Sequence, residues 1–103
     1  GELVLQAYGA NDVTSSFSGL SSGWAIQSGA VGNGTGRLYL NGALLKSSPR
    51  NYATVNSRIY LGAELGGLGY ANMDVAAVLV YDRVLSDNER SEVEQYLTNK
   101  YLN

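Results

Sequence analysis

The chain has 103 residues, 45% of them hydrophobic and 16% charged, which excludes a disordered tail and favours one small folded domain. Its formal net charge of −2 argues against nucleic acid or an anionic membrane as a partner, because both attract basic surfaces. Cysteine and histidine are absent, so disulfides, the usual zinc sites and catalysis by cysteine or histidine are excluded. The longest apolar run, residues 75–81, is too short to span a membrane.

The first third of the chain predicts two strands with a polar loop between them. Residues 3–8 alternate between two faces, as a strand does, and residues 24–28 repeat this pattern. Residues 9–23 contain five serines without periodicity and predict a long loop. Residues 29–36 are rich in glycine and predict a turn.

A β-hairpin is the strongest local prediction of the sequence. Two apolar runs, residues 37–40 and 43–46, are joined by Asn41-Gly42. A two-residue hairpin turn needs positive φ at both central positions, and Asn-Gly adopts this conformation at the lowest cost. Residues 47–57 then predict a loop, with Pro49 near its start.

The second half predicts two more strands. Residues 58–61 form a short apolar segment that ends at a glycine, whereas residues 66–69 contain too much glycine for regular structure. Residues 75–81 are apolar on both faces, which is typical of a strand that is covered on both faces. We expect an opposing sheet on one face and a helix on the other.

That helix is predicted at the C-terminal end. Ser86 and Glu89 form a capping box, in which each side chain binds a backbone amide of the first turn. The helix is expected from about Asp87 to Lys100. Its buried stripe would consist of Val93, Tyr96, Leu97 and Tyr101, and its solvent face of Glu92, Glu94, Gln95 and Asn99.

Four segments carry motifs that occur in this order in one protein family. They are the hairpin at residues 36–42, the strand at 58–62, the closing segment at 74–90 and the ending at 94–101. Trp24 also stands where this family places a tryptophan before the hairpin. Over the last two thirds of the chain, the sequence therefore resembles the laminin G-like, concanavalin A-like lectin domains.

The resemblance implies an all-β fold: an antiparallel β-sandwich of the jelly-roll, concanavalin A-like type with one C-terminal α-helix. Residues 1–103 then form a single domain, or the C-terminal portion of a longer one, since complete members have further N-terminal strands. An unfinished sandwich exposes a sheet edge and an apolar face. We therefore expect a homo-oligomer, or association with further strands of a parent chain, with residues 3–8 as a free edge.

The sequence argues against an enzyme. Sugar-cleaving relatives carry a Glu-x-Asp-x-Glu pattern on one strand, and this chain has none. Asp74 and Asp82 share a strand face, but in an extended strand they lie about 26 Å apart. The two carboxylates of a glycosidase must lie within roughly 5–10 Å of each other.

Calcium is a second possibility that the resemblance raises, because several relatives hold it in a rim loop. The ion takes six to eight oxygen ligands, and the donors here lack a D-x-D spacing. Asn11 and Asp12 are more simply explained as caps of a turn. We expect no metal and no other cofactor. The calcium donors considered are Asn11, Asp12, Glu64, Asn72 and Asp74.

Carbohydrate is the third candidate ligand. Sugar sites combine an aromatic face with amide and guanidinium groups, and two loops offer this set: Arg50, Asn51 and Tyr52 in one, Tyr70 and Asn72 in the other. The simpler alternative is that these tyrosines only fill sheet surfaces.

We therefore predict a non-catalytic recognition module for carbohydrate (glycan) binding or adhesion, on an extracellular, virion or cell surface. The alternative is a structural or assembly domain of a surface layer, fibre or virion that contacts other proteins. Both readings exclude nucleic acid and membrane insertion, and a glycan array separates them.

Overall fold

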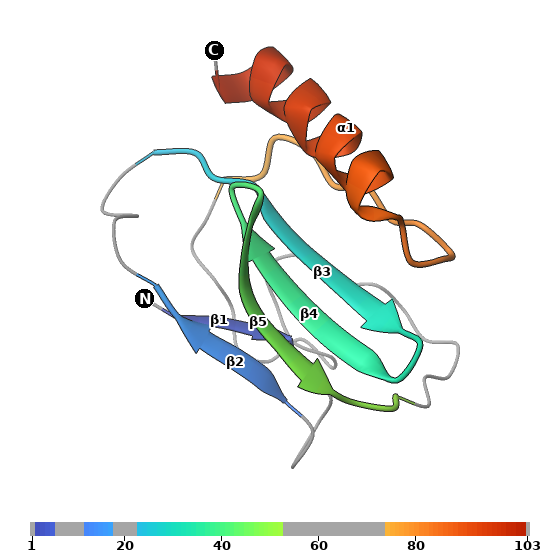
Figure 1. Cartoon of the computed structure of the whole chain (residues 1–103). Helices are drawn as coiled ribbons and strands as arrows, with labels where there is room; N and C mark the ends of the chain where they lie inside the picture. Colours follow the sequence, from blue (N-terminus) through green and yellow to red (C-terminus); the bar gives the residue numbers. More distant parts are fainter. Residues whose placement is uncertain (1, 6–11, 18–22, 53–73, 103) are drawn as a thin grey trace.

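The computed structural model describes residues 2–5, 12–17, 23–52 and 74–102. Within these residues the chain is mainly β, with one α-helix at its C-terminal end (Figure 1). The elements are β1 Glu2–Leu5, β2 Val13–Ser16, β3 Gln27–Gly32, β4 Thr35–Leu40, β5 Ala43–Pro49, α1 Asp87–Leu97 and the π-helical turn η1 Thr98–Leu102.

The described strands form two antiparallel sheets, one of order β1-β2 and one of order β3-β4-β5. The prediction of a loop over residues 9–23 is wrong at β2, which pairs with β1 so that Leu5 lies opposite Val13. β1 is therefore not the unpartnered strand that the sequence suggested. Pairing and the burial of Val13, which is 1% exposed, outweigh the weak strand pattern of this polar segment.

Asn-Gly turns connect the three strands of the larger sheet. Asn41 and Gly42 have φ values of 48° and 85°, which confirms the predicted hairpin. Asn33 and Gly34 form an equivalent turn, with φ values of 52° and 74°. The predicted turn over residues 29–36 is therefore too wide, because β3 extends to Gly32 and β4 begins at Thr35.

The ends of two elements differ from the prediction. Of residues 24–28, only Gln27 and Ser28 belong to a strand. Ile26 instead forms two hydrogen bonds with Asn41 in the hairpin turn. The backbone amide of Ile26 donates to Asn41 Oδ1, and the carbonyl of Ile26 accepts from the backbone amide of Asn41. β5 continues to Pro49, so the expected loop begins at Arg50. Proline is tolerated there because β5 lies at the edge of its sheet.

The larger sheet packs on both faces. On one face, Val13 and Leu38 are buried between the two sheets at 1% and 5% exposure. The Val13 side chain packs closely against the β4 backbone, since a Cβ on Gly36 would lie 3.1 Å from Val13 Cγ2. On the other face, Tyr39 is buried beneath α1, which runs along β3 (Figure 1).

One strand prediction is wrong and two predictions are not addressed. Residues 75–81 are extended without belonging to a strand, and their side chains are exposed. No described strand pairs with them, and nothing described covers their second face. The predicted strand at 58–61 and the glycine-rich segment at 66–69 lie outside the described residues. Among the described helices, none has the length and apolarity needed to cross a membrane.

Candidate functional site

The structure places three of the predicted sugar-binding residues directly after β5. Arg50 donates to the carbonyls of Pro49 at 2.7 Å and of Asp12 at 3.3 Å. Tyr52 is half-buried, and a Cβ on Gly36 would lie 3.5 Å from its ring. Asn51 is exposed. Arg50 and Tyr52 thus contact the scaffold, while Tyr70 and Asn72 lie outside the described residues.

The residues considered for calcium are not brought together where they are described. Asp12 is half-buried near β2, whereas Asp74 is exposed at the start of the apolar run. Asn11, Glu64 and Asn72 lie outside the described residues. Over residues 2–5, 12–17, 23–52 and 74–102, no group of three or more acidic side chains is arranged to hold a metal ion.

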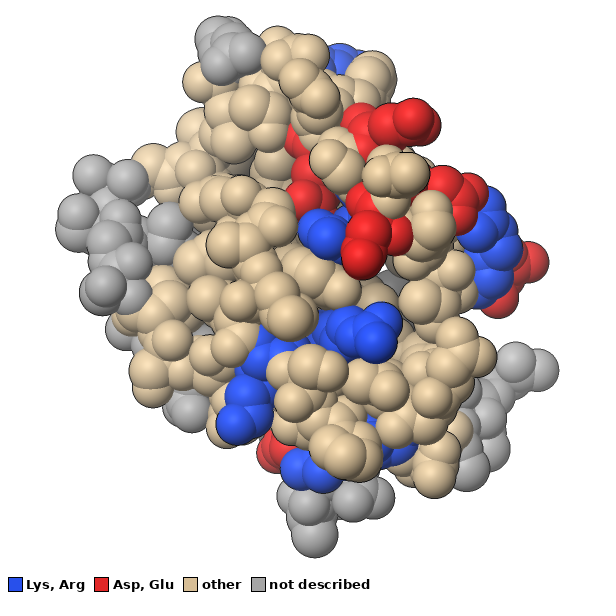
Figure 2. All heavy atoms as spheres, viewed as in Figure 1, with Lys and Arg blue, Asp and Glu red and all other residues tan. Residues whose placement is uncertain are grey.

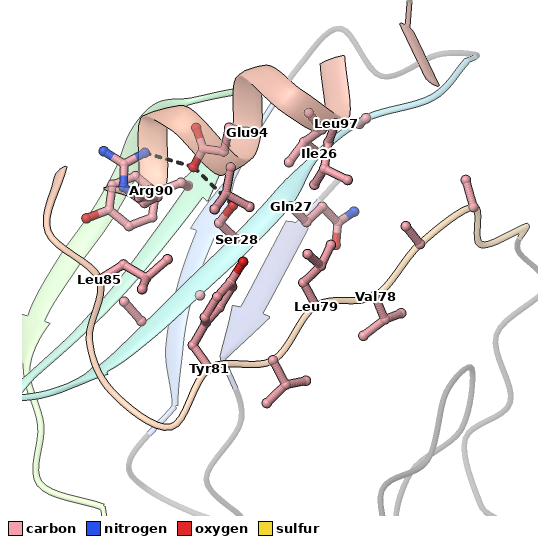
Figure 3. A pocket seen from close by; sticks show the side chains of 18 of the residues that line it. Ile26, Gln27, Ser28, Val78, Leu79, Tyr81, Leu85, Arg90, Glu94 and Leu97 are labelled. Carbon is pink, nitrogen blue, oxygen red and sulfur yellow. Dashed lines mark hydrogen bonds and ion pairs between the residues drawn. The ribbon is translucent and has the colours of Figure 1, made fainter. Parts of the chain in front are cut away.

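A groove of about 770 Å³ lies on the helix side of the larger sheet (Figure 3). Its floor is formed by β3 together with Arg37 and Tyr39 of β4. Residues 74–85 form one wall, and the inner face of α1 with η1 forms the other. We call this feature the β3 groove, and residues 75–81 the apolar run.

The apolar run leaves its side chains open to solvent. Val80 is 74% exposed, and Val75, Val78, Leu79 and Tyr81 are each between 44% and 51% exposed. Figure 3 shows Leu79 and Tyr81 pointing toward β3 and Val78 pointing the other way, the alternation expected of an extended strand. None of these residues makes a backbone hydrogen bond with the described part of the chain.

Exposed apolar side chains concentrate in this groove. Of the twelve large hydrophobic side chains that are exposed in the described residues, nine line it. They include Trp24 and Tyr101. The other three are Val4, Leu44 and Tyr96. Soluble monomers rarely expose a continuous apolar patch of this kind unless something binds it.

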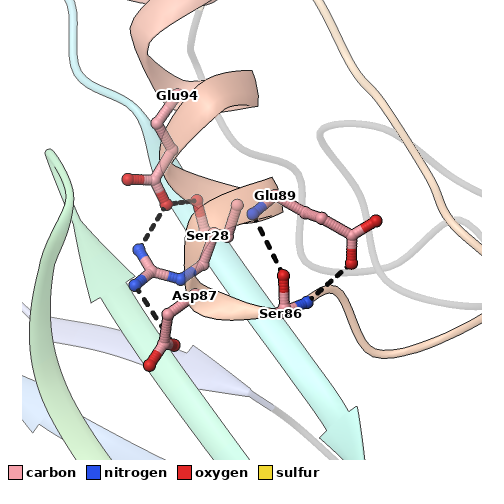
Figure 4. A network of polar contacts seen from close by, with 6 residues as sticks. Ser28, Ser86, Asp87, Glu89 and Glu94 are labelled. Carbon is pink, nitrogen blue, oxygen red and sulfur yellow. Dashed lines mark hydrogen bonds and ion pairs between the residues drawn. The ribbon is translucent and has the colours of Figure 1, made fainter.

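A buried ion pair fixes α1 above β3 and β4 (Figure 4). Glu94 Oε1 accepts from Ser28 Oγ at 3.2 Å and from Arg90 Nη1 at 2.8 Å. The Arg90 guanidinium lies 3.7 Å above the centre of the Tyr39 ring. Burial alone lowers the pKa of Arg90, but the hydrogen bond and the charge of Glu94 outweigh it, so that this pKa is raised.

This network corrects the predicted helix faces. Glu94 was expected in solvent but is 7% exposed, whereas Tyr96 was expected in the buried stripe and is 55% exposed. Val93 and Leu97 do face the groove. The signal available in the sequence is Arg90, four residues before Glu94, a spacing that brings opposite charges together on one helix face.

The predicted capping box is confirmed. Glu89 N donates to Ser86 Oγ at 3.2 Å, and Ser86 N donates to Glu89 Oε1 at 3.0 Å. Arg83 Nη1 also donates to Glu89 Oε1 at 2.8 Å. These bonds lower the pKa of the Glu89 carboxyl to about 2. The hydrogen bond from Arg83 has the largest effect, and the one from the Ser86 amide has the next largest. The cap holds the start of α1 at the end of the apolar run.

Charge is distributed unevenly over the face of the molecule that Figure 2 shows. Figure 2 shows acidic side chains gathered over α1, with basic side chains over the sheet below it. Within the groove, Asp74 and Asp82 flank the apolar run, which itself carries no charge, and Arg83, Arg90 and Glu94 also line the walls. Arg37 lies on the floor, half-buried, and its guanidinium has no hydrogen bond or ion pair with the part of the chain that the structure describes.

No protein-family model and no curated protein matches the chain. Its fold is similar to that in the crystal structure of residues 221–444 of an S-layer domain-containing protein from Clostridium thermocellum. The two structures superpose with a TM-score of 0.64 at 18% identity, over 90% of this chain and 50% of that one. The chain thus spans half the length of that structure, and the likeness shows a shared fold.

Proposed function

We propose that the chain is a non-catalytic structural domain that contacts other proteins in a cell-surface or particle-surface assembly. The observation that carries this proposal is the β3 groove, which is lined by nine exposed large hydrophobic residues. Apolar surface of this extent is typical of a protein interface. The similarity to an S-layer domain-containing protein supports the surface setting.

The charged residues around the groove support a structural role. Glu94 and Glu89 are each bound by an arginine, and both attach α1 to its surroundings. Carboxylates that are bound by arginines in this way stabilise the fold, because they fix the position of α1. The walls of the groove offer apolar side chains to a partner, and protein surfaces provide the matching apolar area.

Site-specific photo-crosslinking in cells that display the protein tests the proposal. A photoreactive residue at position 80 in the apolar run should crosslink to protein in the assembled surface. The matched control carries the same residue at Thr14, which is also exposed but lies on β2. Absence of a protein adduct at position 80, or equal adducts at both positions, would overturn the proposal.

Glycan recognition by a laminin G-like jelly roll is the competing proposal. Its support is the sequence resemblance and the position of Asn51, which is exposed beside Arg50 and Tyr52 after β5. A glycan array on the purified chain decides between the two. A specific glycan signal that is lost in Asn51→Ala favours a lectin, and an empty array favours assembly.

A further inference from the structure

We propose that a small pocket between α1 and the Asn41-Gly42 turn binds a primary ammonium group, the lysine side chain of a partner protein. The site is carried by its own geometry, whereas the assignment of the lysine to a partner protein rests on the proposed function. The pocket has a volume of about 260 Å³, and we call it the hairpin pocket. Besides Glu94, its lining consists of Ile26, Asn41, Ser91, Gln95, Thr98 and Asn99.

One carboxylate oxygen of Glu94 provides the charge of this pocket. Oε1 accepts from Ser28 and Arg90, whereas Oε2 forms no hydrogen bond within the described residues (Figure 4). Glu94 is only 7% exposed. Even so, Oε2 is open to solvent, because no sealed side-chain oxygen or nitrogen of the described residues lacks a partner. An accessible carboxylate oxygen of this kind can accept a hydrogen bond from a ligand.

The hairpin turn keeps this oxygen accessible. A Cβ on Gly42 would lie 3.1 Å from Glu94 Oε2, which is closer than most side-chain contacts, so glycine leaves the space beside the carboxylate open. Its φ of 85° is also a conformation that other residues rarely adopt. Asn41 Oδ1 accepts from the Ile26 amide at 2.9 Å, and this bond fixes the Asn41 side chain at the edge of the pocket. The turn therefore shapes one side of the site before any ligand binds.

The arrangement selects an ammonium over other cations. A guanidinium binds a carboxylate best through parallel hydrogen bonds to both oxygens, but Ser28 and Arg90 already bind Oε1. An ammonium is a point charge with three donors, so it can bind Oε2 and two neutral oxygens. Ser91 and Gln95 line the pocket, and their side chains form no hydrogen bond within the described residues. A divalent metal would need further carboxylates, and the described residues group none around Glu94.

The surroundings of the pocket favour a basic partner. α1 contains four carboxylates and one arginine, and Figure 2 shows acidic side chains gathered over it. This excess of negative charge attracts a basic surface. Ile26 and Glu94 line both the hairpin pocket and the β3 groove, so one partner can cover the groove and place a lysine in the pocket. The partner is therefore expected to carry a lysine beside its apolar contact surface.

Titration of the purified chain with Nα-acetyl-lysine N-methylamide, followed by nuclear magnetic resonance, tests the site. We expect saturable shifts of the side-chain amide signals of Asn41 and Gln95, with a dissociation constant on the order of 1 mM. The matched probe is the same molecule acetylated at Nζ, which has no charge and should cause no saturable shift. Absence of saturation at about 20 mM of the lysine probe would overturn the inference.

Two pairs of variants locate the binding, and circular dichroism verifies that each variant is folded. Glu94→Gln should weaken binding of the lysine probe about tenfold, whereas Glu92→Gln, which removes an equal charge from the exposed face of α1, should change it little. Gln95→Lys brings an ammonium of the chain itself to the pocket, leaves Glu94 unaltered and should compete with the probe. Its control is Asn88→Lys, an equal change of charge at an exposed position of α1 outside the pocket. Equal losses within either pair would overturn the inference.

A last comparison separates the source of the ammonium from the proposed function. In cells that display the protein, the crosslink from position 80 to protein should be weaker in Gln95→Lys than in Asn88→Lys. Equal crosslinks in these two variants would reject the partner's lysine and retain the proposed function. Absence of the crosslink in the otherwise unaltered chain would reject the proposed function, and the protein source with it. Tighter binding of glucosamine than of the lysine probe would place the ammonium on a glycan and overturn its assignment to a protein.

Discussion

Glu94 is the buried residue of α1, and its position shows how a single carboxylate orients the helix. It bonds Arg90 within the helix and Ser28 on β3, and a Cβ on Gly42 would lie 3.1 Å from its second oxygen. Three elements thus meet at one carboxyl group. A buried charge is tolerated only when it is paired and hydrogen-bonded in this way.

We expect Glu94→Ala to lower the free energy of unfolding by about 2–4 kcal/mol, because it removes the hydrogen-bond acceptor of Ser28 and the nearer of two carboxylates that pair with the half-buried Arg90 charge, leaving Asp87 at 3.6 Å. Glu94→Gln should cost less, since the amide still accepts from Ser28. Urea denaturation followed by Trp24 fluorescence measures both. Glu92→Ala, on the exposed face, is the control, and an equal loss there would contradict this account.

The burial of Glu94 could not be predicted from the sequence, for a physical reason. Helical periodicity groups residues by hydrophobicity, and it therefore assigned Glu94 to solvent and Tyr96 to the core. The deciding contact is with Ser28, which is 66 residues away in the chain. Such a contact depends on how the helix lies across the sheet, which no local pattern records.

Among the secondary-structure elements, those fixed by local chemistry were predictable. The Asn41-Gly42 hairpin and the Ser86–Glu89 cap each depend on residues within a few positions of one another, and both are confirmed. β2 and the apolar run depend on partners elsewhere. β2 was missed because β1 stabilises it, and residues 75–81 were predicted as a covered strand because their composition favours one.

The start of α1 should be sensitive to acid. The pKa of Glu89 is about 2 in the folded chain, below its ordinary value of 4.5, so the carboxylate stabilises the fold above pH 4.5. That contribution is lost as the pH falls from 4.5 toward 2. Thermal unfolding monitored by circular dichroism should show the melting temperature falling across this window.

Replacement of the titrating group isolates its effect. Glu89→Gln should reduce the acid-induced fall in melting temperature, because the capping box no longer contains a carboxylate. Glu92→Gln should retain the fall, since it alters an exposed carboxylate outside the cap. If wild type and Glu89→Gln respond identically to acid, the cap does not contribute as described.

At the scale of the whole molecule, two sheets and a helix are joined through few buried side chains of the described residues. Val13 from the smaller sheet and Leu38 from the larger one meet between the layers. The sequence predicted a layered β fold with a C-terminal helix, and the described residues agree with that outline. The contacts between layers were not predictable, because β2 was not recognised as a strand.

Val13→Ala should lower the free energy of unfolding by about 2 kcal/mol, since it removes buried methyl groups from the junction of the sheets. Thr14→Ala, which alters the exposed neighbour on the same strand, is the control. Urea unfolding should be followed both by Trp24 fluorescence and by far-ultraviolet circular dichroism. Coincident curves are expected if the two layers unfold together, and separate transitions would show that Val13 does not couple them.

The two Asn-Gly turns also bear on the order in which the chain folds. β3, β4 and β5 follow one another with two-residue connections, so closing their loops costs little entropy. The contact between Ser28 and Glu94 must close a loop of 66 residues and comes later. During synthesis, the residues of all three strands are made before those of α1. Among the described strands β3 pairs only with β4, so its other edge can meet another polypeptide before α1 packs along it.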